Sequence, residues 1–258
     1  MAKIRLDELL LRRELVETVQ EARARIMAGE IIVGESRLDK AGLLVDENSS
    51  VRVRSRKAQK YVSRGGLKLE GALRAFEIDV SGLICLDLGA STGGFTDCLI
   101  RDGAKMVYAV DVGYGLLDWS LRGHDKVVCL ERTHVADLTR EHITEPIDLV
   151  VADLSFNSLI RLIPPVLPLL KPKASAVLLI KPQFEARKDE VGEKGIVTDP
   201  EIHQRVCDDI ARSMEGLGAR VLGLIESPIF GTGGNREFLI ALRLDSIRSK
   251  MTNDCHDE

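Results

Sequence analysis

The pattern of apolar and polar positions divides this chain into a short first part and a longer second part. Between residues 5 and 55, apolar side chains recur at helical spacing in RLDELLLRRELV and in VQEARARIMAGE, where Gly29 is placed to end the second helix. Two β-rich segments follow, EIIVGES and SSVRVRS, and the turn-rich stretch DKAGLLVDEN separates them. The first part is therefore predicted to form a compact α+β unit.

In the second part, apolar strands alternate with helical segments after the helix GGLKLEGALRAF. This order is typical of a Rossmann-like, doubly wound α/β sheet that is mostly parallel. The seven expected strands are LICLDLG, MVYAVDVG, VVCLER, IDLVVADL, SAVLLIKP, ARVLGLIE and REFLIALRL. The last two lack a long crossover between them, which predicts a terminal hairpin that inserts one antiparallel strand. That feature is typical of methyltransferases that use S-adenosylmethionine and is unusual in dehydrogenases.

The length of 258 residues allows one substantial domain and a small one. We place the small domain at residues 1–60, the α/β domain at 61–245 and a flexible tail at 246–258. No apolar run approaches the ~20 residues that span a bilayer, and the charged N-terminus is unlike a secretory signal. The five cysteines include no C-x-x-C pair, which argues against a zinc site. We expect a cytoplasmic monomer with no metal and no membrane segment.

The charge distribution points to a nucleic-acid partner although the net charge does not. A formal net charge of −4 would argue against such a partner if the charges were evenly spread. Residues 51–68, VRVRSRKAQKYVSRGGLK, instead hold seven basic residues and no acidic one. Such a run is often only a solvated face, but Tyr61 and the adjacent glycine pair favour a surface that contacts phosphates. The candidate RNA-binding residues, here and on the predicted helices, are Arg5, Arg12, Arg13, Arg23, Arg25 and Arg64.

A glycine-rich turn joins the first strand of the α/β part to a helix in ICLDLGASTGGFTDCLI, residues 84–100. A nucleoside triphosphate loop would need a lysine directly after the glycine pair, where Phe95 stands. A dinucleotide fingerprint would need a glycine two residues after Gly89, where Ser91 stands. S-adenosylmethionine carries no phosphate, and its site needs a close backbone approach to its methionine part. The turn therefore favours this cofactor over NAD.

Carboxylates at the ends of neighbouring strands extend the predicted cofactor site. Asp87, two residues before Gly89, is placed to hold the ammonium group, and Asp111 is placed to accept both ribose hydroxyls. Asp111 would serve a dinucleotide equally well, and Glu131 would touch ribose or adenine or be a surface carboxylate. The predicted cofactor-binding residues are Asp87, Gly89, Ser91, Thr92, Gly93, Gly94, Phe95, Asp111, Val112 and Glu131.

Two further polar residues end apolar strands, Asp153 in LVVADLSF and Lys181 in LLIKPQFE. In this architecture ligands bind at the carboxyl edge of the sheet, where both residues should lie. Asp-Leu-Ser-Phe at 153–156 is neither the N/D-P-P-Y/F motif of amino-group methyltransferases nor the Pro-Cys nucleophile of pyrimidine carbon-five methyltransferases. A lysine that ends a buried strand favours a functional role over a surface one.

Together, YVSRGGLKL, LDLGASTGGFTD, AVDVGYGLLDWSLR, VVADLSF, IKPQFE and GNREF resemble the TlyA-type ribosomal RNA 2′-O-methyltransferases, whose catalytic domain is of the FtsJ type. The resemblance covers nearly the whole chain. It implies methyl transfer from S-adenosylmethionine to a ribose 2′-hydroxyl of ribosomal RNA, within the cytidine class. It also implies a catalytic tetrad of Lys68, Asp153, Lys181 and Glu237, although Lys68 and Glu237 taken alone would be surface residues.

The first part resembles the small RNA-binding domain of ribosomal protein S4. The resemblance rests on RLDELL, on Ala22, Ile26 and Gly29, and on Lys40 with Gly42. It implies that residues 1–60 bind ribosomal RNA or ribosomal subunits. In the α/β part, the stretch ERTHVA departs from the family pattern at His134 and Ala136.

Two functions of other classes are alternatives. Members of the same family carry the label haemolysin, so one alternative is a membrane-active protein, although the sequence has no amphipathic or spanning segment that supports it. The other alternative is a non-catalytic RNA-binding module. That function would need a degenerate cofactor turn or tetrad.

Overall fold

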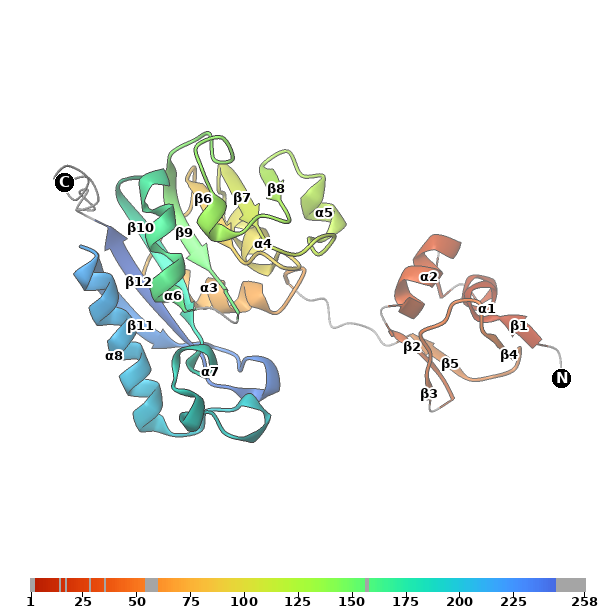
Figure 1. Ribbon diagram of the computed structural model, residues 1–258. Coiled ribbons are helices and arrows are strands. Elements are labelled where there is room, and N and C mark those ends of the chain that lie inside the picture. Colours follow the sequence, from red (N-terminus) through yellow and green to blue (C-terminus); the bar gives the residue numbers. More distant parts are fainter. Residues whose placement is uncertain are drawn as a thin grey trace. The chain divides into compact units, whose positions relative to one another are not determined.

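The computed structural model describes residues 3–244 apart from residues 14, 17, 28, 35, 54–59, 156 and 157. The chain divides into two compact units, Met1–Gln59 and Lys60–Glu258 (Figure 1). Each unit has its own hydrophobic core. The tail expected at 246–258 and part of the basic run, residues 54–59, lie outside the described residues.

The first unit combines two helices with short antiparallel strands. Its elements are β1 (Lys3–Arg5), α1 (Leu6–Arg12), α2 (Val19–Met27), β2 (Ile31–Val33), β3 (Ser36–Arg37), β4 (Leu44–Asp46) and β5 (Val51–Val53). β1 pairs with β4, and β2 lies between β3 and β5. Leu6, Leu9 and Leu10 of α1 are buried together with Ile26 of α2 and Ile31 of β2. The predicted pair of helices is confirmed.

The short strands of this unit differ from the prediction in two places. EIIVGES is not a single strand, because Gly34 takes a φ of +62° and the chain turns back, so that β3 pairs with β2. DKAGLLVDEN contains β4, which pairs with β1, and Val45 of β4 is buried in the core of the unit. Strands of two or three residues carry too little alternation to be recognised from the sequence.

A seven-stranded sheet forms the centre of the second unit. Its strands are β6 (Ile84–Leu88), β7 (Met106–Val110), β8 (Val127–Leu130), β9 (Ile147–Ala152), β10 (Leu170–Ile180), β11 (Arg220–Glu226) and β12 (Phe238–Leu244). The spatial order is β11-β12-β10-β9-β6-β7-β8. β12 runs antiparallel to β10 and β11, whereas the other neighbouring pairs are parallel. The predicted, mostly parallel sheet with one antiparallel strand inserted is confirmed.

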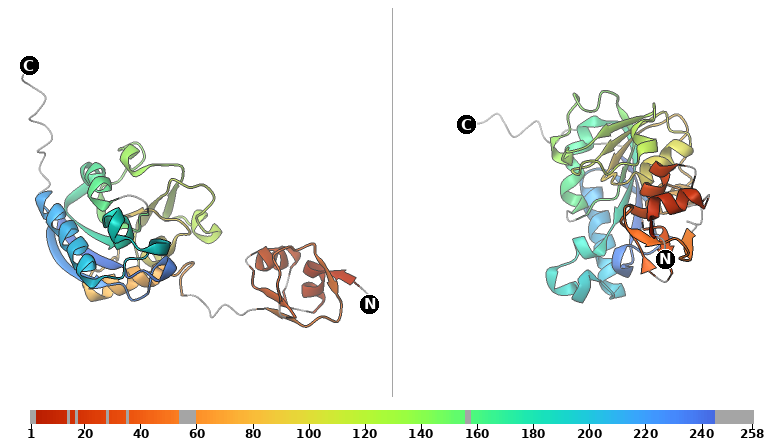
Figure 2. Two further views of the ribbon diagram at one scale, coloured as in Figure 1. Left: turned by 60° about the horizontal axis from the view of Figure 1, so that its bottom comes forward. Right: turned by 90° about the vertical axis from the view of Figure 1, so that its right-hand side faces the viewer.

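Helices cover both faces of this sheet, because alternate residues of each strand point to opposite sides. Leu86 and Val150 belong to a core that includes α8 (Pro200–Gly216), whereas Cys85 and Leu149 belong to a second core with α3 (Gly65–Ala75) and α4 (Gly94–Arg101). Figures 1 and 2 show α3 and α8 on opposite faces. The carboxyl ends of β6, β9 and β10 meet at one edge between the two layers.

Shorter helical segments complete the second unit. They are the α-helices α5 (Trp119–Arg122), α6 (Leu159–Leu162) and α7 (Pro182–Glu185), and the 3-10 segments Val135–Asp137, Pro164–Leu169, Lys188–Glu190, Glu193–Gly195 and Thr232–Gly234. α5 and α7 follow β7 and β10, so they border the carboxyl edge of the sheet.

Candidate active site

Four charged side chains from distant parts of the sequence meet at the carboxyl edge of the sheet. Lys68 lies in the first turn of α3, Asp153 follows β9, Lys181 follows β10, and Glu237 directly precedes β12. β10 lies between parallel β9 and antiparallel β12, so the residues that end β9 and β10 and begin β12 are neighbours. α3 packs against β12, which brings Lys68 to the same place.

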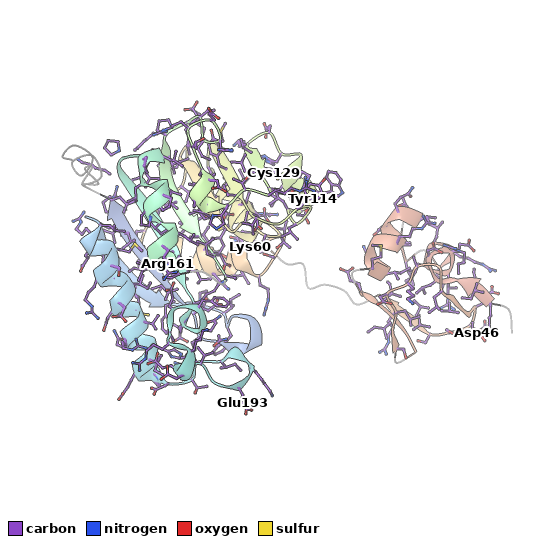
Figure 3. The ribbon with its side chains drawn as sticks, in the orientation of Figure 1. Asp46, Lys60, Tyr114, Cys129, Arg161 and Glu193 are labelled. Carbon is purple, nitrogen blue, oxygen red and sulfur yellow. The ribbon has the colours of Figure 1, made fainter. Side chains whose placement is uncertain are left out.

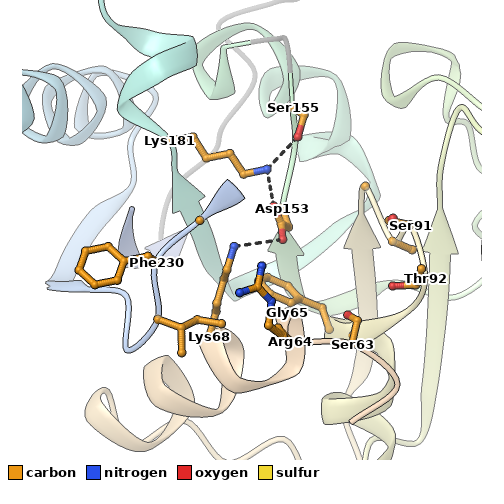
Figure 4. A pocket seen from close by; sticks show the side chains of 16 residues that line it. Ser63, Arg64, Gly65, Lys68, Ser91, Thr92, Asp153, Ser155, Lys181 and Phe230 are labelled. Carbon is orange, nitrogen blue, oxygen red and sulfur yellow. Dashed lines mark hydrogen bonds and ion pairs between the residues drawn. The ribbon is translucent and has the colours of Figure 1, made fainter. Parts of the chain in front are cut away.

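The four side chains form an alternating row of cations and anions, which we call the charged row. Figure 4 shows three of its members, Lys181, Asp153 and Lys68. The Lys181 ammonium lies 2.6 Å from Asp153 Oδ1, and the Lys68 ammonium lies 4.0 Å from Asp153 Oδ2. Lys68 Nζ also donates to Glu237 Oε2 at 2.6 Å. Each of the two central members, Asp153 and Lys68, therefore has an opposite charge on both sides.

The charged row lies largely out of solvent. The Lys68 and Lys181 side chains are each 11% exposed, Glu237 is 2% exposed, and Asp153 is the most accessible member at 22%. Removing a single charge from such a set would leave its partner buried without compensation, which typically costs ~3–5 kcal/mol. Lys68 and Glu237, which resemble surface residues when taken singly, are thus buried by the packing of α3 against β12.

Ser155 is a further polar residue of this site that the sequence did not reveal. Its Oγ accepts a hydrogen bond of 2.8 Å from Lys181 Nζ (Figure 4). An ammonium has three N–H donors, and Asp153 and Ser155 take two of them. Among the described residues Lys181 Nζ has no other hydrogen-bond partner, so its third position is open to a ligand or water. The only available signal was that Ser155 stands two residues after Asp153, in a segment that continues from a strand end.

A pocket of 290 Å³ opens beside the charged row. Side chains and backbone from five segments line it: Ser63, Arg64, Gly65, Lys68, Gly89, Ala90, Ser91, Thr92, Gly94, Phe95, Asp153, Ser155, Lys181, Ile229, Phe230 and Gly231. The glycine turn and the charged row therefore share one cavity. Arg64, predicted to bind RNA, lies in this cavity together with five of the predicted cofactor residues.

Asp87 lies beneath the glycine turn and is completely buried. Its Oδ2 accepts a hydrogen bond of 2.6 Å from the Thr96 hydroxyl, and its Oδ1 has no hydrogen-bond partner among the described residues. Burial raises the pKa of Asp87 to about 7, although the Thr96 hydrogen bond opposes this shift. An unpaired, buried carboxylate oxygen is suited to a cationic group.

Asp111 and Glu131 fix the backbone that follows β7. Asp111 accepts hydrogen bonds from the Ser91 and Gly113 amides at 2.8 and 2.7 Å. Glu131 accepts from the Leu116 amide and from Arg122, and the Arg122 hydrogen bond is the main cause that lowers the pKa of Glu131 to about 2. Both carboxylates therefore hold the loop in place, and neither lines the pocket. Of the other predicted cofactor residues, Asp87, Gly93 and Val112 also lie outside its lining.

The arginines of the first unit are engaged within that unit. Asp7 is buried, and hydrogen bonds from Arg5 and Arg23 at 2.8 and 3.1 Å hold it. The Arg5 hydrogen bond is the main cause that lowers the pKa of Asp7 to about 2. Arg13 donates to the Ser49 carbonyl oxygen.

The two remaining predicted arginines form ion pairs near the surface, Arg12 with Glu47 and Arg25 with Glu21. Surface pairs of this kind contribute little stability and exchange readily for other anions. The side chains of these arginines remain between 39% and 64% exposed: Arg5, Arg12, Arg23 and Arg25.

A mostly parallel seven-stranded sheet with one antiparallel strand inserted, and a lysine–carboxylate site beside a glycine turn, define the class of this unit as a methyltransferase. Residues 61–244 match the model of the FtsJ-like methyltransferase family, and residues 4–51 match that of the S4 domain. The chain belongs to the FtsJ-like methyltransferase family and carries an S4 domain before it. The match confirms the predicted class and, with it, S-adenosylmethionine as the methyl donor.

Curated relatives and a solved structure extend this similarity over nearly the full chain. The chain is 42% identical to the 16S/23S rRNA (cytidine-2′-O)-methyltransferase TlyA of Mycobacterium tuberculosis, over 99% of this chain and 95% of the relative. It is 45% identical to YqxC of Bacillus subtilis, named as an rRNA methyltransferase, over 93% and 85%. A solved structure from Streptococcus thermophilus, named as a hemolysin, is 39% identical with a TM-score of 0.71, over 94% and 89%.

The described residues include neither a membrane-spanning helix nor a metal site. No helix among them is sufficiently long and apolar to cross a membrane. Within the same residues, no group of three or more histidine, cysteine, aspartate or glutamate side chains is arranged to hold a metal ion.

Gly231 allows the loop before β12 to pass close to Glu237. A Cβ at Gly231 would lie 2.1 Å from Glu237 Oε1, and Lys68 holds that carboxylate in place. We expect Gly231→Ala to lower the free energy of unfolding by ~1–3 kcal/mol, the usual cost of overpacking a filled site. Urea unfolding followed by circular dichroism measures this change.

Gly216→Ala is the matched control, because a Cβ at this helical position meets no atom within 4 Å. It should leave stability unchanged or raise it by up to ~1 kcal/mol through a smaller entropy of the unfolded chain. Equal stability of the two variants would show that Glu237 is free to move.

Proposed function

We propose that this protein transfers a methyl group from S-adenosylmethionine to the 2′-hydroxyl of a cytidine in ribosomal RNA. The observation that carries the proposal is the charged row beside the glycine turn in one pocket, with one hydrogen-bonding position of Lys181 Nζ left for a substrate hydroxyl. The name of the M. tuberculosis relative supports the cytidine ribose as the target. Residues of the charged row come into direct contact here, so the non-catalytic alternative has no degenerate site to support it.

The residues around the glycine turn fit the methyl donor. Asp87 would face the donor's ammonium group with its unpaired Oδ1, and Asp111 and Glu131 would meet the nucleoside part beyond the pocket. The turn residues Gly89 to Phe95 would form the wall around the methionine part. When bound, S-adenosylmethionine supplies an electrophilic methyl group on a positively charged sulfur.

Lys181 is the residue that we place against the ribose hydroxyl. A ribose hydroxyl is a weak nucleophile, so its oxygen must be aligned with the methyl group and must lose its proton during the transfer. Lys181, in its uncharged form, would accept this proton, while Asp153 and Ser155 fix the position of Nζ. General-base assistance is worth roughly 10²–10⁴-fold, whereas alignment contributes up to ~7–11 kcal/mol. Positioning therefore supplies the larger share.

Lys68 and Glu237 act one step further from the substrate. Their pairing satisfies two buried charges and holds Asp153 from the side opposite Lys181. Arg64 lies at the pocket wall and would contact a phosphate of the RNA. We also propose that the protein acts as a monomer in the cytoplasm, because the second unit alone lines the pocket and ribosomal RNA is the proposed substrate.

Replacing Lys181 tests its role directly. Lys181→Ala should reduce methyl transfer by roughly 10²–10⁴-fold, with little change in the affinities for cofactor and RNA, because the group acts in the transition state. Lys181→Arg should fail as well, since a guanidinium stays protonated. Transfer of labelled methyl groups to ribosomal RNA measures both variants. An active arginine variant would leave Lys181 only a positioning role, and a base-methylated product would refute the 2′-hydroxyl as target.

Proton release on cofactor binding tests Asp87. With a pKa of about 7, Asp87 is mostly protonated near pH 6, and an arriving ammonium favours the ionised form. Binding should therefore release a proton at that pH, and affinity should rise between about pH 6 and pH 8. Calorimetry in buffers of different ionisation enthalpy measures the proton, and Asp87→Asn should abolish it. If the native protein binds the cofactor without releasing a proton, Asp87 does not contact the ammonium group.

Deleting residues 1–59 tests the division of labour between the units. The second unit keeps its own hydrophobic cores in such a variant. Methylation of ribosomal RNA should be lost while cofactor binding by calorimetry is retained. RNA affinity of the full chain should also fall steeply with added salt, because phosphate contacts release counterions. Full activity of the truncated protein would show that the first unit is not needed to bind the RNA substrate.

A further inference from the structure

Four large apolar side chains project into solvent from one short segment after β7. Within residues 112–119, Val112 and Tyr114 are each 66% exposed, Leu116 is 45% exposed, and Trp119 is 82% exposed. Figure 3 shows Tyr114 pointing outward from the edge of the second unit. Large apolar groups gathered in this way usually mark a surface that binds a partner.

The segment is held rigidly although its apolar side chains are exposed. Leu117 and Leu121 pack beneath it against Ala90 and Ala109. The Asp118 amide donates to the Thr92 carbonyl oxygen, and the Asp118 side chain caps α5. Asp111 and Glu131 also accept hydrogen bonds from amides of this segment. These contacts preorganise the surface, so that binding a ligand would cost little conformational entropy.

Each exposed ring is accompanied by an arginine. The Arg132 guanidinium carbon lies 4.1 Å from the centre of the Tyr114 ring, and that of Arg122 lies 5.9 Å from the centre of the Trp119 ring. Arg132 has a φ of +54°, which non-glycine residues rarely adopt, and its amide bonds to the Gly113 carbonyl oxygen. A strained backbone of this kind is retained where surrounding contacts enforce it, often at binding surfaces.

We propose that Tyr114, Trp119, Arg122 and Arg132 form a stacking surface for unpaired nucleotides of the RNA substrate. Exposed aromatic rings bind the faces of unstacked bases, and guanidinium groups stack on bases or pair with phosphates. The surface begins at the pocket rim, because Asp118 is bonded to Thr92, a residue of the pocket wall. This inference rests on the proposed function, which requires RNA to lie beside that pocket.

RNA fits this surface better than a lipid bilayer does. Asp118 is exposed between Leu116 and Trp119, so a charged group interrupts the apolar face. Arginine beside an aromatic ring suits alternating bases and phosphates, whereas a membrane anchor requires a continuous apolar face.

Trp119 is the only tryptophan of the chain, so its fluorescence reports on this surface in the native protein. We expect a short single-stranded oligocytidylate, or protein-free 23S rRNA, to shield Trp119 from acrylamide severalfold at saturation. The demethylated cofactor alone should leave Trp119 accessible. Trp119→Ala should weaken RNA binding roughly 5- to 100-fold, the loss expected for one base stack, and Trp119→Phe should recover part of it.

Leu224→Ala is the matched control. Leu224 is 39% exposed on β11, at the opposite edge of the sheet from β8, and its replacement should leave RNA affinity unchanged. The proposal is overturned if RNA binds while Trp119 stays accessible to acrylamide, or if neither the oligocytidylate nor the 23S rRNA binds. It is also overturned if Trp119→Ala and Leu224→Ala bind RNA with equal affinity. Shielding by the cofactor alone, by phosphatidylglycerol vesicles but not RNA, or by raised protein concentration would assign the surface to another partner. Methylation of ribosomal RNA by the native protein tests the proposed function separately.

Discussion

The alternation of two ammonium groups and two carboxylates in a nearly water-free place is the interaction on which the second unit depends. Each buried charge costs several kcal/mol in lost hydration and is tolerated only with good partners at short distance. Lys181, Asp153, Lys68 and Glu237 meet this requirement because β9 and β10 end, and β12 and α3 begin, within reach of one another. The apolar sheet beneath supplies the rigidity that such distances demand.

The loops around the charged row show the same dependence. Asn235, two residues before Glu237, accepts a hydrogen bond from the Val197 amide at 3.0 Å and donates to the Gly195 carbonyl oxygen at 2.9 Å. These bonds fix the backbone from which Glu237 projects. Asp111 and Glu131 do similar work on the other side of the glycine turn, where they order residues 112–119. Several carboxylates of this protein therefore fix the backbone of loops, in addition to those that face the pocket.

The first unit uses charge in a simpler way. Asp7 is buried in α1, and arginines from β1 and α2 close over it, so that one carboxylate joins three elements of a small domain. The hydrophobic core of this unit is small, and such a link between elements adds order that few apolar contacts provide. The same arginines keep part of their surface exposed, so a structural role and contact with RNA phosphates are compatible.

The sequence by itself determined the sheet, its antiparallel insertion, the glycine turn and the strand-end residues Asp153 and Lys181. These features follow from local periodicity and from the rule that parallel strands end at one edge, which a linear pattern expresses. Family motifs were needed to add Lys68 and Glu237, because nothing local distinguishes them from surface residues.

Only the tertiary structure decided which charges are paired and buried. Lys68 and Glu237 are 169 positions apart, and the contact between them exists because α3 packs on β12. The hydrogen bond of Ser155 to Lys181, the burial of Asp7 and the exposure of Trp119 likewise depend on which segments lie against each other. Burial and pairing are properties of surroundings contributed by remote residues, so a side chain's own position in the sequence does not contain them.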